Sequence, residues 1–158
     1  VSHWYPTLRA SIPERVDTVC VPPRQVVVEV TETEAMANPG FAAHLNKELK
    51  KLGCWFALDD FGSGMSSFAY LQSLPVDYLK IAGTFSRRLD NDLIDYAMVE
   101  AINRVGHVMS LKTVAEAVES PEVLEKLREI GVDYAPVFLV AAPGPSDDIG
   151  AGGERVKH

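Results

Sequence analysis

Cys54-Trp55-Phe56-Ala57-Leu58-Asp59-Asp60-Phe61-Gly62-Ser63-Gly64 places two adjacent carboxylates between an apolar run and a glycine-rich turn. The apolar run predicts a buried strand. Two charges at the end of such a strand call for a compensating cation, because burying a lone carboxylate costs several kcal/mol. Arg, Lys or a divalent metal can supply that charge. The two glycines let the following loop bend freely. The strand, the acidic tip and the flexible loop together predict the edge of an active site.

Five short apolar runs recur along the chain and indicate the fold class. They are nearly continuous in Val, Ile, Leu and Ala, which is typical of parallel strands covered on both faces. Helical patterns lie between them, so the sequence predicts an α/β fold with mainly parallel strands and flanking helices. No internal repeat stands out beyond this alternation. The runs cover residues 25–30, 55–58, 76–81, 110–115 and 132–140.

The helices between these runs carry start and stop signals. Gly53 follows the first helical pattern as a stop, and Gly106 is expected to close the second. Ser120 is the expected cap of the third helix, with Pro121 in its first turn. A further helix is expected near the start of the chain. The four helical patterns cover residues 4–19, 41–52, 93–105 and 121–130.

Length, composition and charge exclude several classes of protein. The 158 residues, 47% of them hydrophobic, suffice for one domain with a real core. The net charge of -7 argues against a DNA-binding surface built on positive charge. Cys20 and Cys54 lack metal-binding or redox spacing, so they are expected to be reduced core thiols of a cytoplasmic protein. No apolar run is long enough to span a membrane, so no membrane contact is expected.

Charged residues stand near the C-terminal ends of four successive apolar runs. The carboxyl ends of parallel strands meet at one edge, where α/β proteins carry their chemistry. Carboxylate oxygens there suit hard cations such as Mg²⁺ or Mn²⁺. Two such ions that share an aspartate can drive in-line attack on a phosphodiester, with a lysine to orient water or neutralise charge. The residues are Glu29 and Glu32, Asp59 and Asp60, Lys80, and Glu116 and Glu119.

Each of these residues, taken singly, also has a structural interpretation. Glu29 can be an edge charge, and Lys80 a solvated strand end. Glu116 can favour the start of the following helix through the helix dipole. Asp59-Asp60 before glycine can form a turn. Their coincidence at four strand ends favours the functional interpretation.

Four segments, in this order and spacing, resemble the EAL domain family. Its members are cyclic di-GMP phosphodiesterases built on a modified (β/α)8 barrel. The resemblance runs from about Gln25 to Pro143 and implies a partial or modified TIM-type (β/α)8 barrel. It also implies cyclic di-GMP as the ligand, Mg²⁺ or Mn²⁺ as the cofactor, and hydrolysis to linear pGpG. The segments are Val28-Glu29-Val30-Thr31-Glu32, residues 58–67, residues 74–81 and Val114-Ala115-Glu116-Ala117-Val118-Glu119.

The resemblance implies a role for each matching residue. Asp59 and Asp60 resemble aspartates that two metals share, and Glu29 and Glu116 resemble further metal ligands. Lys80 and Glu119 resemble catalytic residues, the lysine as the group that contacts the attacking water and the glutamate in support. Glu32 resembles the glutamate that steadies the loop after the aspartates. That loop, which the resemblance links to dimerisation, comprises Phe61, Gly62, Ser63, Gly64, Ser66 and Ser67.

Several positions depart from the family pattern. Ala82 stands where the family usually has aspartate, Ala117 where it has glycine, and Pro136-Val137 where it has Gln-Gly. The Glu-Ala-Leu motif and the asparagine ligand would fall before Val1. Hydrolysis by this chain alone is therefore not expected. The alternative hypothesis is a degenerate, non-catalytic module that binds nucleotide or a protein partner.

The expected domain covers residues 1–142, and the turn-prone residues 143–158 are expected to form a flexible tail. Five strands are too few to close a (β/α)8 barrel. An exposed sheet edge invites another strand. We therefore expect self-association, with a homodimer or another protein as partner.

Overall fold

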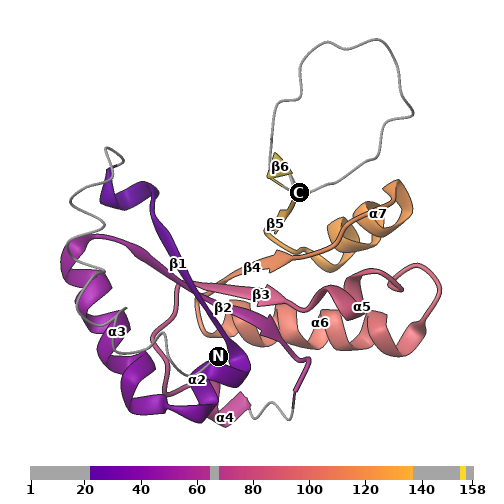
Figure 1. The fold of residues 1–158 in the computed structure, drawn as a ribbon. Helices are drawn as coiled ribbons and strands as arrows, with labels where there is room; N and C mark the ends of the chain where they lie inside the picture. Colours follow the sequence, from indigo (N-terminus) through magenta and orange to yellow (C-terminus); the bar gives the residue numbers. More distant parts are fainter. Residues whose placement is uncertain (1–21, 65–67, 137–153, 156–158) are drawn as a thin grey trace.

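A computed structural model describes residues 22–64, 68–136 and 154–155. Strands β1 to β5 lie side by side in sequence order and run parallel, and the two-residue β6 pairs antiparallel with β5. Helices connect the strands and flank the sheet (Figure 1). This arrangement confirms the predicted α/β fold with mainly parallel strands. The strands are β1 (Val27–Thr31), β2 (Trp55–Phe61), β3 (Tyr78–Ile81), β4 (Lys112–Ala115), β5 (Tyr134–Ala135) and β6 (Glu154–Arg155).

Side-chain caps fix the starts of α3 (Pro39–Leu52), which precedes β2, and of α7 (Pro121–Ile130), which follows β4. The Asn38 side chain accepts a hydrogen bond from the backbone of Phe41, and that of Ser120 accepts one from Val123. Gly53 and Gly131 end these helices in the left-handed conformation that glycine tolerates best. The helices are η1 (Pro23–Gln25), α2 (Glu32–Ala37), α3 (Pro39–Leu52), α4 (Phe68–Leu71), α5 (Gly83–Ser86), α6 (Leu93–Val108) and α7 (Pro121–Ile130).

Gly106 does not close its helix, which corrects the sequence-based expectation. Helix α6 continues through this glycine to Val108. Gly106 is buried, and a Cβ at this position would lie 2.9 Å from Cγ2 of Thr113 in β4. The glycine therefore serves close packing of α6 on the sheet and does not act as a stop.

The strand bounds also differ from the apolar runs. β2 extends to Phe61, so Asp59 and Asp60 lie within the strand and not beyond its tip. Its pairing with β3 shifts register between Leu58 and Phe61. An extra residue in a strand re-aims the side chains around it. Apolarity alone could not locate this bulge, because the bulge is made of the two charged residues.

Some expectations concern residues beyond the described ranges. The expected helix over 4–19 and the part of the last apolar run after Pro136 lie outside the described residues. Within the expected tail, Glu154 and Arg155 pair with β5, and the rest of 143–158 lies outside the described residues. In the described part of the chain, no helix has the length and apolar character needed to cross a bilayer.

A short repeat that sequence patterning overlooked anchors the start of two strands. Val76-Asp77-Tyr78 enters β3, and Val132-Asp133-Tyr134 enters β5. The Asp77 carboxylate accepts a hydrogen bond from the backbone N–H of Phe56 at 2.9 Å. The Asp133 carboxylate accepts one from Thr113 at 3.0 Å. Each aspartate thus ties its strand to the preceding one at the end of the sheet away from the carboxylate cluster.

Asp133 is expected to make the fold sensitive to acid. Burial alone raises its pKa, but hydrogen bonds from Lys112, the Thr113 backbone and His107 outweigh this and lower the pKa to about 2. Because the folded pKa lies below the ordinary 3.8, the stabilisation is present above pH 4 and is lost as the pH falls towards 2. Asp133→Asn should lower the free energy of unfolding by about 1.5 kcal/mol at pH 7.

Urea unfolding at pH 7 and pH 3 measures this difference. The difference in the free energy of unfolding between wild type and Asp133→Asn should be smaller at pH 3 than at pH 7. Asp90→Asn, a change at an exposed aspartate, is the control and should leave the free energy of unfolding unchanged at both pH values. An equal difference at the two pH values would contradict the assignment of this acid sensitivity to Asp133.

Candidate active site

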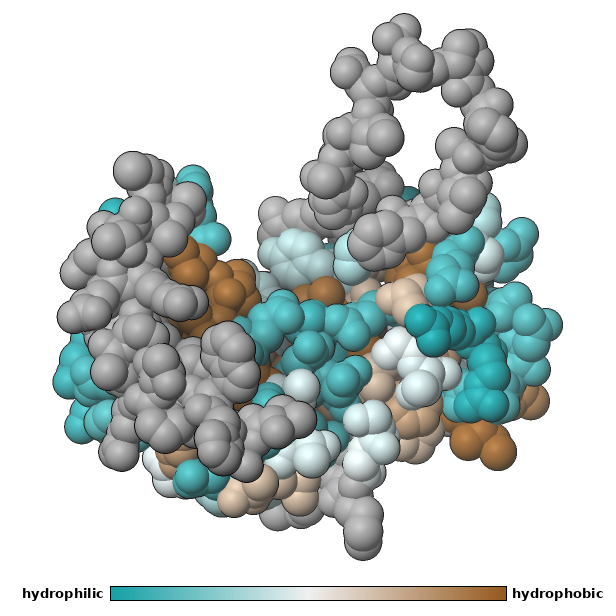
Figure 2. Space-filling model, in the orientation of Figure 1, coloured by the Kyte–Doolittle hydropathy of each residue, from teal (hydrophilic) through white to brown (hydrophobic). Residues whose placement is uncertain are grey.

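Lys80 lies at the centre of a carboxylate cluster at the C-terminal ends of the strands. Its ammonium Nζ lies 2.9 Å from Oε2 of Glu29 in β1, 2.9 Å from Oδ1 of Asp59 in β2 and 2.6 Å from Oε1 of Glu116 just after β4. The Lys80 side chain is only 14% exposed. The structure therefore brings together the charged residues of four strands, as the sequence predicted. Figure 2 shows hydrophilic residues gathered across the middle of the viewed face.

The charge state of Lys80 limits its chemical role. Burial by itself lowers the pKa of Lys80, but hydrogen bonds to Glu116, Glu29 and Asp59 outweigh burial and raise it above its usual range. The amine therefore stays protonated at neutral pH. It can hold a water or a phosphate oxygen and neutralise developing negative charge, but it cannot act as a general base.

Three carboxylates beside Lys80 meet the spacing of a cation site. Asp59, Asp60 and Glu116 each offer an oxygen within 4.8 Å of the others. Asp60 adopts a positive φ of 53° in the β2 bulge, an uncommon conformation for a residue with a side chain. Burial, with the negative charges of Asp59 and Asp60, raises the pKa of Glu116 in spite of Lys80. The cluster is thus short of positive charge, and its oxygen donors suit Mg²⁺ or Mn²⁺.

Glu32 holds the start of the loop that follows the aspartates. Its side chain is buried, and its Oε2 accepts a hydrogen bond of 3.0 Å from the backbone N–H of Gly62. Gly62 has a φ of +93°, and a Cβ there would lie 2.8 Å from the Phe85 ring. The Ser63 hydroxyl donates to the carbonyl of Asp60 at 2.7 Å. Glu32 and Ser63 thus hold the backbone at the start of the loop, between Asp60 and Gly62.

The remaining loop residues fall into different settings. Phe61 belongs to β2 and is buried, so it is a core residue and not a flexible loop residue. Gly64 is exposed, and a Cβ there would meet Oε2 of Glu32 at 3.9 Å. Ser66 and Ser67 lie outside the described residues. The role of this loop in dimerisation stays a prediction.

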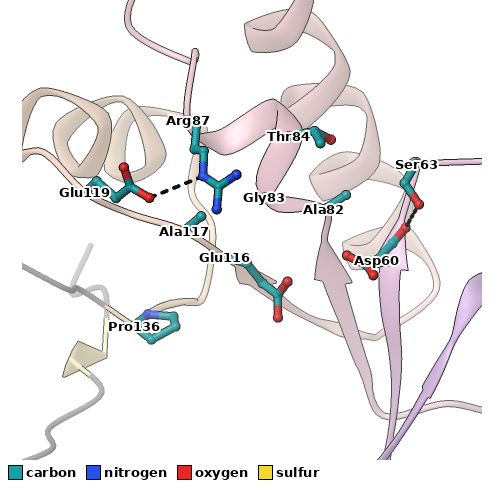
Figure 3. A pocket seen from close by; sticks show the side chains of 10 residues that line it. All are labelled: Asp60, Ser63, Ala82, Gly83, Thr84, Arg87, Glu116, Ala117, Glu119 and Pro136. Carbon is teal, nitrogen blue, oxygen red and sulfur yellow. Dashed lines mark hydrogen bonds and ion pairs between the residues drawn. The ribbon is translucent and has the colours of Figure 1, made fainter.

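Glu119 lies apart from the carboxylate cluster. Its side chain is 63% exposed, and its Oε1 accepts a hydrogen bond of 3.2 Å from Nε of Arg87. This pair borders a pocket of about 660 Å³ that Asp60 and Glu116 also line (Figure 3). Sequence reasoning overlooked Arg87, which follows α5 directly, because its partner Glu119 is 32 residues away in the chain. The pocket is lined by Asp60, Ser63, Ala82, Gly83, Thr84, Arg87, Glu116, Ala117, Glu119 and Pro136.

Glu32→Ala should loosen this loop. The change leaves the Gly62 N–H without its acceptor and opens space beside it, so the free energy of unfolding should fall by about 1.5 kcal/mol. Limited proteolysis should cut residues 61–68 faster than in wild type. Glu32→Gln keeps an acceptor oxygen and serves as the matched control, and equal cleavage of all three proteins would rule out the anchoring role.

Parallel strands that carry acidic residues and a half-buried lysine at their carboxyl ends define a class of α/β domain with a candidate cation site. The EAL domain family model matches residues 7–143. The chain therefore belongs to the EAL domain family, and the prediction from its motifs is confirmed.

Relatives and solved structures support the same family and fold. Cyclic di-GMP phosphodiesterase PdeB of Shewanella oneidensis is 45% identical over 125 residues, which cover 79% of this chain and 15% of that protein. The PaMucR phosphodiesterase in complex with c-di-GMP has a TM-score of 0.73 at 32% identity, covering 92% of this chain and 57% of that one. BlrP1 of Klebsiella pneumoniae, in a manganese and cyclic di-GMP complex, has a TM-score of 0.67 at 30% identity, covering 71% and 29%.

These matches confirm that the chain has part of the EAL domain's TIM-like barrel. The chain spans between 15% and 19% of the length of three curated relatives that it matches. The activity of those proteins therefore bears on this chain as a proposal.

Proposed function

We propose that this chain is a cyclic di-GMP signalling domain that carries the cation-binding and lysine-bearing part of a phosphodiesterase site. The observation that supports this most directly is the convergence of Glu29, Asp59 and Glu116 on Lys80, with Asp60 beside them. Relatives that share the fold are cyclic di-GMP phosphodiesterases or were solved with cyclic di-GMP. The reaction adds water across one phosphodiester bond and yields linear pGpG.

The donor set fits Mg²⁺ or Mn²⁺, because it consists of carboxylate oxygens. Asp59, Asp60 and Glu116 would hold the ion, and a bound divalent ion activates water and stabilises charge on the phosphate. The Lys80 ammonium would contact the phosphate oxygen or the attacking water in the same site. Glu32 would keep the Gly62 turn in place. Glu119, held by Arg87, would support the far side of the pocket.

Hydrolysis is measured with cyclic di-GMP and Mn²⁺, by chromatography of the product. Turnover by wild type above that of an Asp59→Ala variant supports the enzyme. Equal rates for the two proteins would reject catalysis by this chain. Asp90→Asn, at an exposed position away from the cluster, is the matched control and should retain the wild-type rate.

A non-catalytic domain that binds nucleotide or protein is the second candidate. Ala82, buried at 1% exposure, and Pro136 both line the pocket and offer no side-chain donor. Calorimetric binding of cyclic di-GMP without formation of pGpG would favour this function over the enzyme.

Self-association and a cytoplasmic location belong to the same proposal. Cys54 is buried and forms no disulfide within the described residues, and burial raises the pKa of its thiol, which supports a reducing location. Cys20 lies outside the described residues. Sedimentation velocity over a range of concentrations tests association. A sedimentation coefficient that stays at the monomer value throughout would reject the homodimer.

A further inference from the structure

Helix α2 contacts the connection between β2 and α4 at two described points. Near the β2 end, Glu32 accepts a hydrogen bond from the backbone N–H of Gly62. At the α4 end, the hydroxyl of Tyr70 donates a hydrogen bond to the backbone carbonyl of Ala35. We infer that Tyr70 is a positioning residue of the proposed site, which through α2 holds the backbone of the Asp59–Asp60 bulge. The inference rests on the proposed function.

Tyr70 satisfies a carbonyl that α2 leaves without a helical partner. In an α-helix the carbonyl of residue 35 accepts a hydrogen bond from the N–H of residue 39. Residue 39 is a proline and has no N–H. Ala35 is buried, and a buried carbonyl without a donor is costly. The Tyr70 hydroxyl supplies the missing donor, so the sequence of α2 itself favours this contact.

The surroundings of Tyr70 keep its hydroxyl a donor. The ring is partly buried and packs against the hydrophobic core. Burial, with the negative charge of Glu32, raises the pKa of the hydroxyl. The hydroxyl therefore stays protonated at neutral pH. The influence of this charge also shows that Glu32 and Tyr70, which hold the two ends of the connection, lie near each other in space.

The hydrogen bond of Glu32 to Gly62 holds the backbone that leaves Asp60. Two residues after Asp60 the chain is tied to α2, and the N–H and hydroxyl of Ser63 both donate to the Asp60 carbonyl, at 3.2 and 2.7 Å. Asp60 has a φ of 53°, which residues with a side chain rarely adopt. Such a conformation persists only where the surrounding structure maintains it. Helix α2 is part of that structure.

Helix α2 is in turn fixed to the strand that carries Glu29. Thr31, the last residue of β1, caps the helix. Its Oγ1 accepts a hydrogen bond of 3.3 Å from the Glu34 N–H, and Oε2 of Glu34 accepts one of 3.3 Å from the Thr31 N–H. The Tyr70 contact thus ties the connection to a strand of the carboxylate cluster. Loss of the hydroxyl should loosen the turn after Asp60 without removing any carboxylate.

Tyr70→Phe tests the inference, because it removes the hydroxyl and keeps the ring. Amide hydrogen exchange of Gly62 and Ser63 is followed by NMR in metal-free buffer at neutral pH. Exchange at both amides should be about fivefold faster than in wild type, which corresponds to one hydrogen bond of ordinary strength. Tyr96→Phe, at a half-buried tyrosine of α6, is the matched control and should leave both rates unchanged. Unchanged exchange in folded Tyr70→Phe would overturn the inference.

A double-mutant cycle tests the route through α2. If Tyr70 acts through Glu32, the two changes should not be additive. In the background of Glu32→Ala, Tyr70→Phe should change the exchange of the Ser63 amide by less than about twofold. An undiminished effect of Tyr70→Phe in this background would overturn the route through Glu32.

The affinity for Mn²⁺ separates positioning of the site from a purely structural contact. Free Mn²⁺ is followed by electron paramagnetic resonance during titration without nucleotide. Tyr70→Phe should raise the Kd about fivefold, whereas Tyr96→Phe should leave it unchanged. An unchanged Kd together with faster exchange would make Tyr70 a structural residue and overturn its positioning role. A wild-type chain that binds no Mn²⁺ would reject the cation site of the proposed function, whereas hydrogen exchange would still show whether Tyr70 holds the aspartate bulge.

Discussion

Lys80→Met should lower the free energy of unfolding by about 2 kcal/mol in metal-free buffer, and Mn²⁺ should restore most of this loss. Removing the ammonium leaves Glu29, Asp59 and Glu116 close together without their common partner. Breaking a buried ion pair from one side costs about 3–5 kcal/mol. The partial exposure of these carboxylates, between 21% and 47%, reduces the cost here.

The recovery with Mn²⁺ distinguishes repulsion from a general loss of packing. A cation that binds only the folded state stabilises it in proportion to the logarithm of its concentration over Kd. The gain should be larger in Lys80→Met than in wild type, because the variant has more negative charge to offer. Thermal unfolding at fixed protein concentration, with EDTA and with about 1 mM Mn²⁺, measures both the loss of stability and its recovery. This Mn²⁺ concentration is on the order of the Kd of a weak site.

Lys50→Met is the matched control for this prediction. Lys50 pairs with Asp77 at the other end of the sheet, and its side chain is 45% exposed. Its removal should cost less than about 1 kcal/mol and should not change the response to Mn²⁺. Two results would show that the cluster is not short of positive charge. One is a Lys80→Met protein that is as stable as wild type in EDTA, and the other is a gain in its stability with Mn²⁺ that is no larger than the gain of wild type.

The sequence specified the sheet and the membership of the cluster well, for one physical reason. Parallel strands bring their carboxyl ends to one edge. Any charged residue near the end of a buried run is therefore placed there by the fold itself. This principle alone predicts that Glu29, Lys80 and Glu116 lie at the same edge. In the structure Lys80 contacts the two glutamates at 2.6 to 2.9 Å.

The features that sequence could not supply depend on backbone detail. Asp59 and Asp60 lie in a bulge, which follows from a shift of register against β3 and not from residue type. Gly106 carries the same sequence signal as a helix stop, yet its role is contact with Thr113. Glu119 stands three residues after Glu116, but its partner is Arg87 because the chain turns away between them.

Gly83→Ala should destabilise the protein by about 1.5 kcal/mol, although alanine in a helix is normally better than glycine by about 0.5–1 kcal/mol. Gly83 is the first residue of α5. A Cβ at this position would lie 2.9 Å from Cβ of Ala117, a distance that two methyl groups cannot share. Ala117 is held at a φ of +53°, so it has little freedom to move away. Overpacking of this kind costs about 1–3 kcal/mol.

Ala117→Gly should reverse the sign of the effect at Gly83. It removes the opposing methyl group and the cost of a left-handed alanine, about 1–2 kcal/mol, so this variant alone should be at least as stable as wild type. In its background, Gly83→Ala should become neutral or stabilising, with a coupling energy of about 2 kcal/mol in a double-mutant cycle measured by urea unfolding. Gly106→Ala meets Thr113 instead, and its cost should not depend on residue 117.

Additive effects of Gly83→Ala and Ala117→Gly would show that the two positions do not press on each other. A coupling confined to this pair would show that alanine at 117, the position where EAL domains usually carry glycine, is accommodated by the glycine that faces it across the pocket wall.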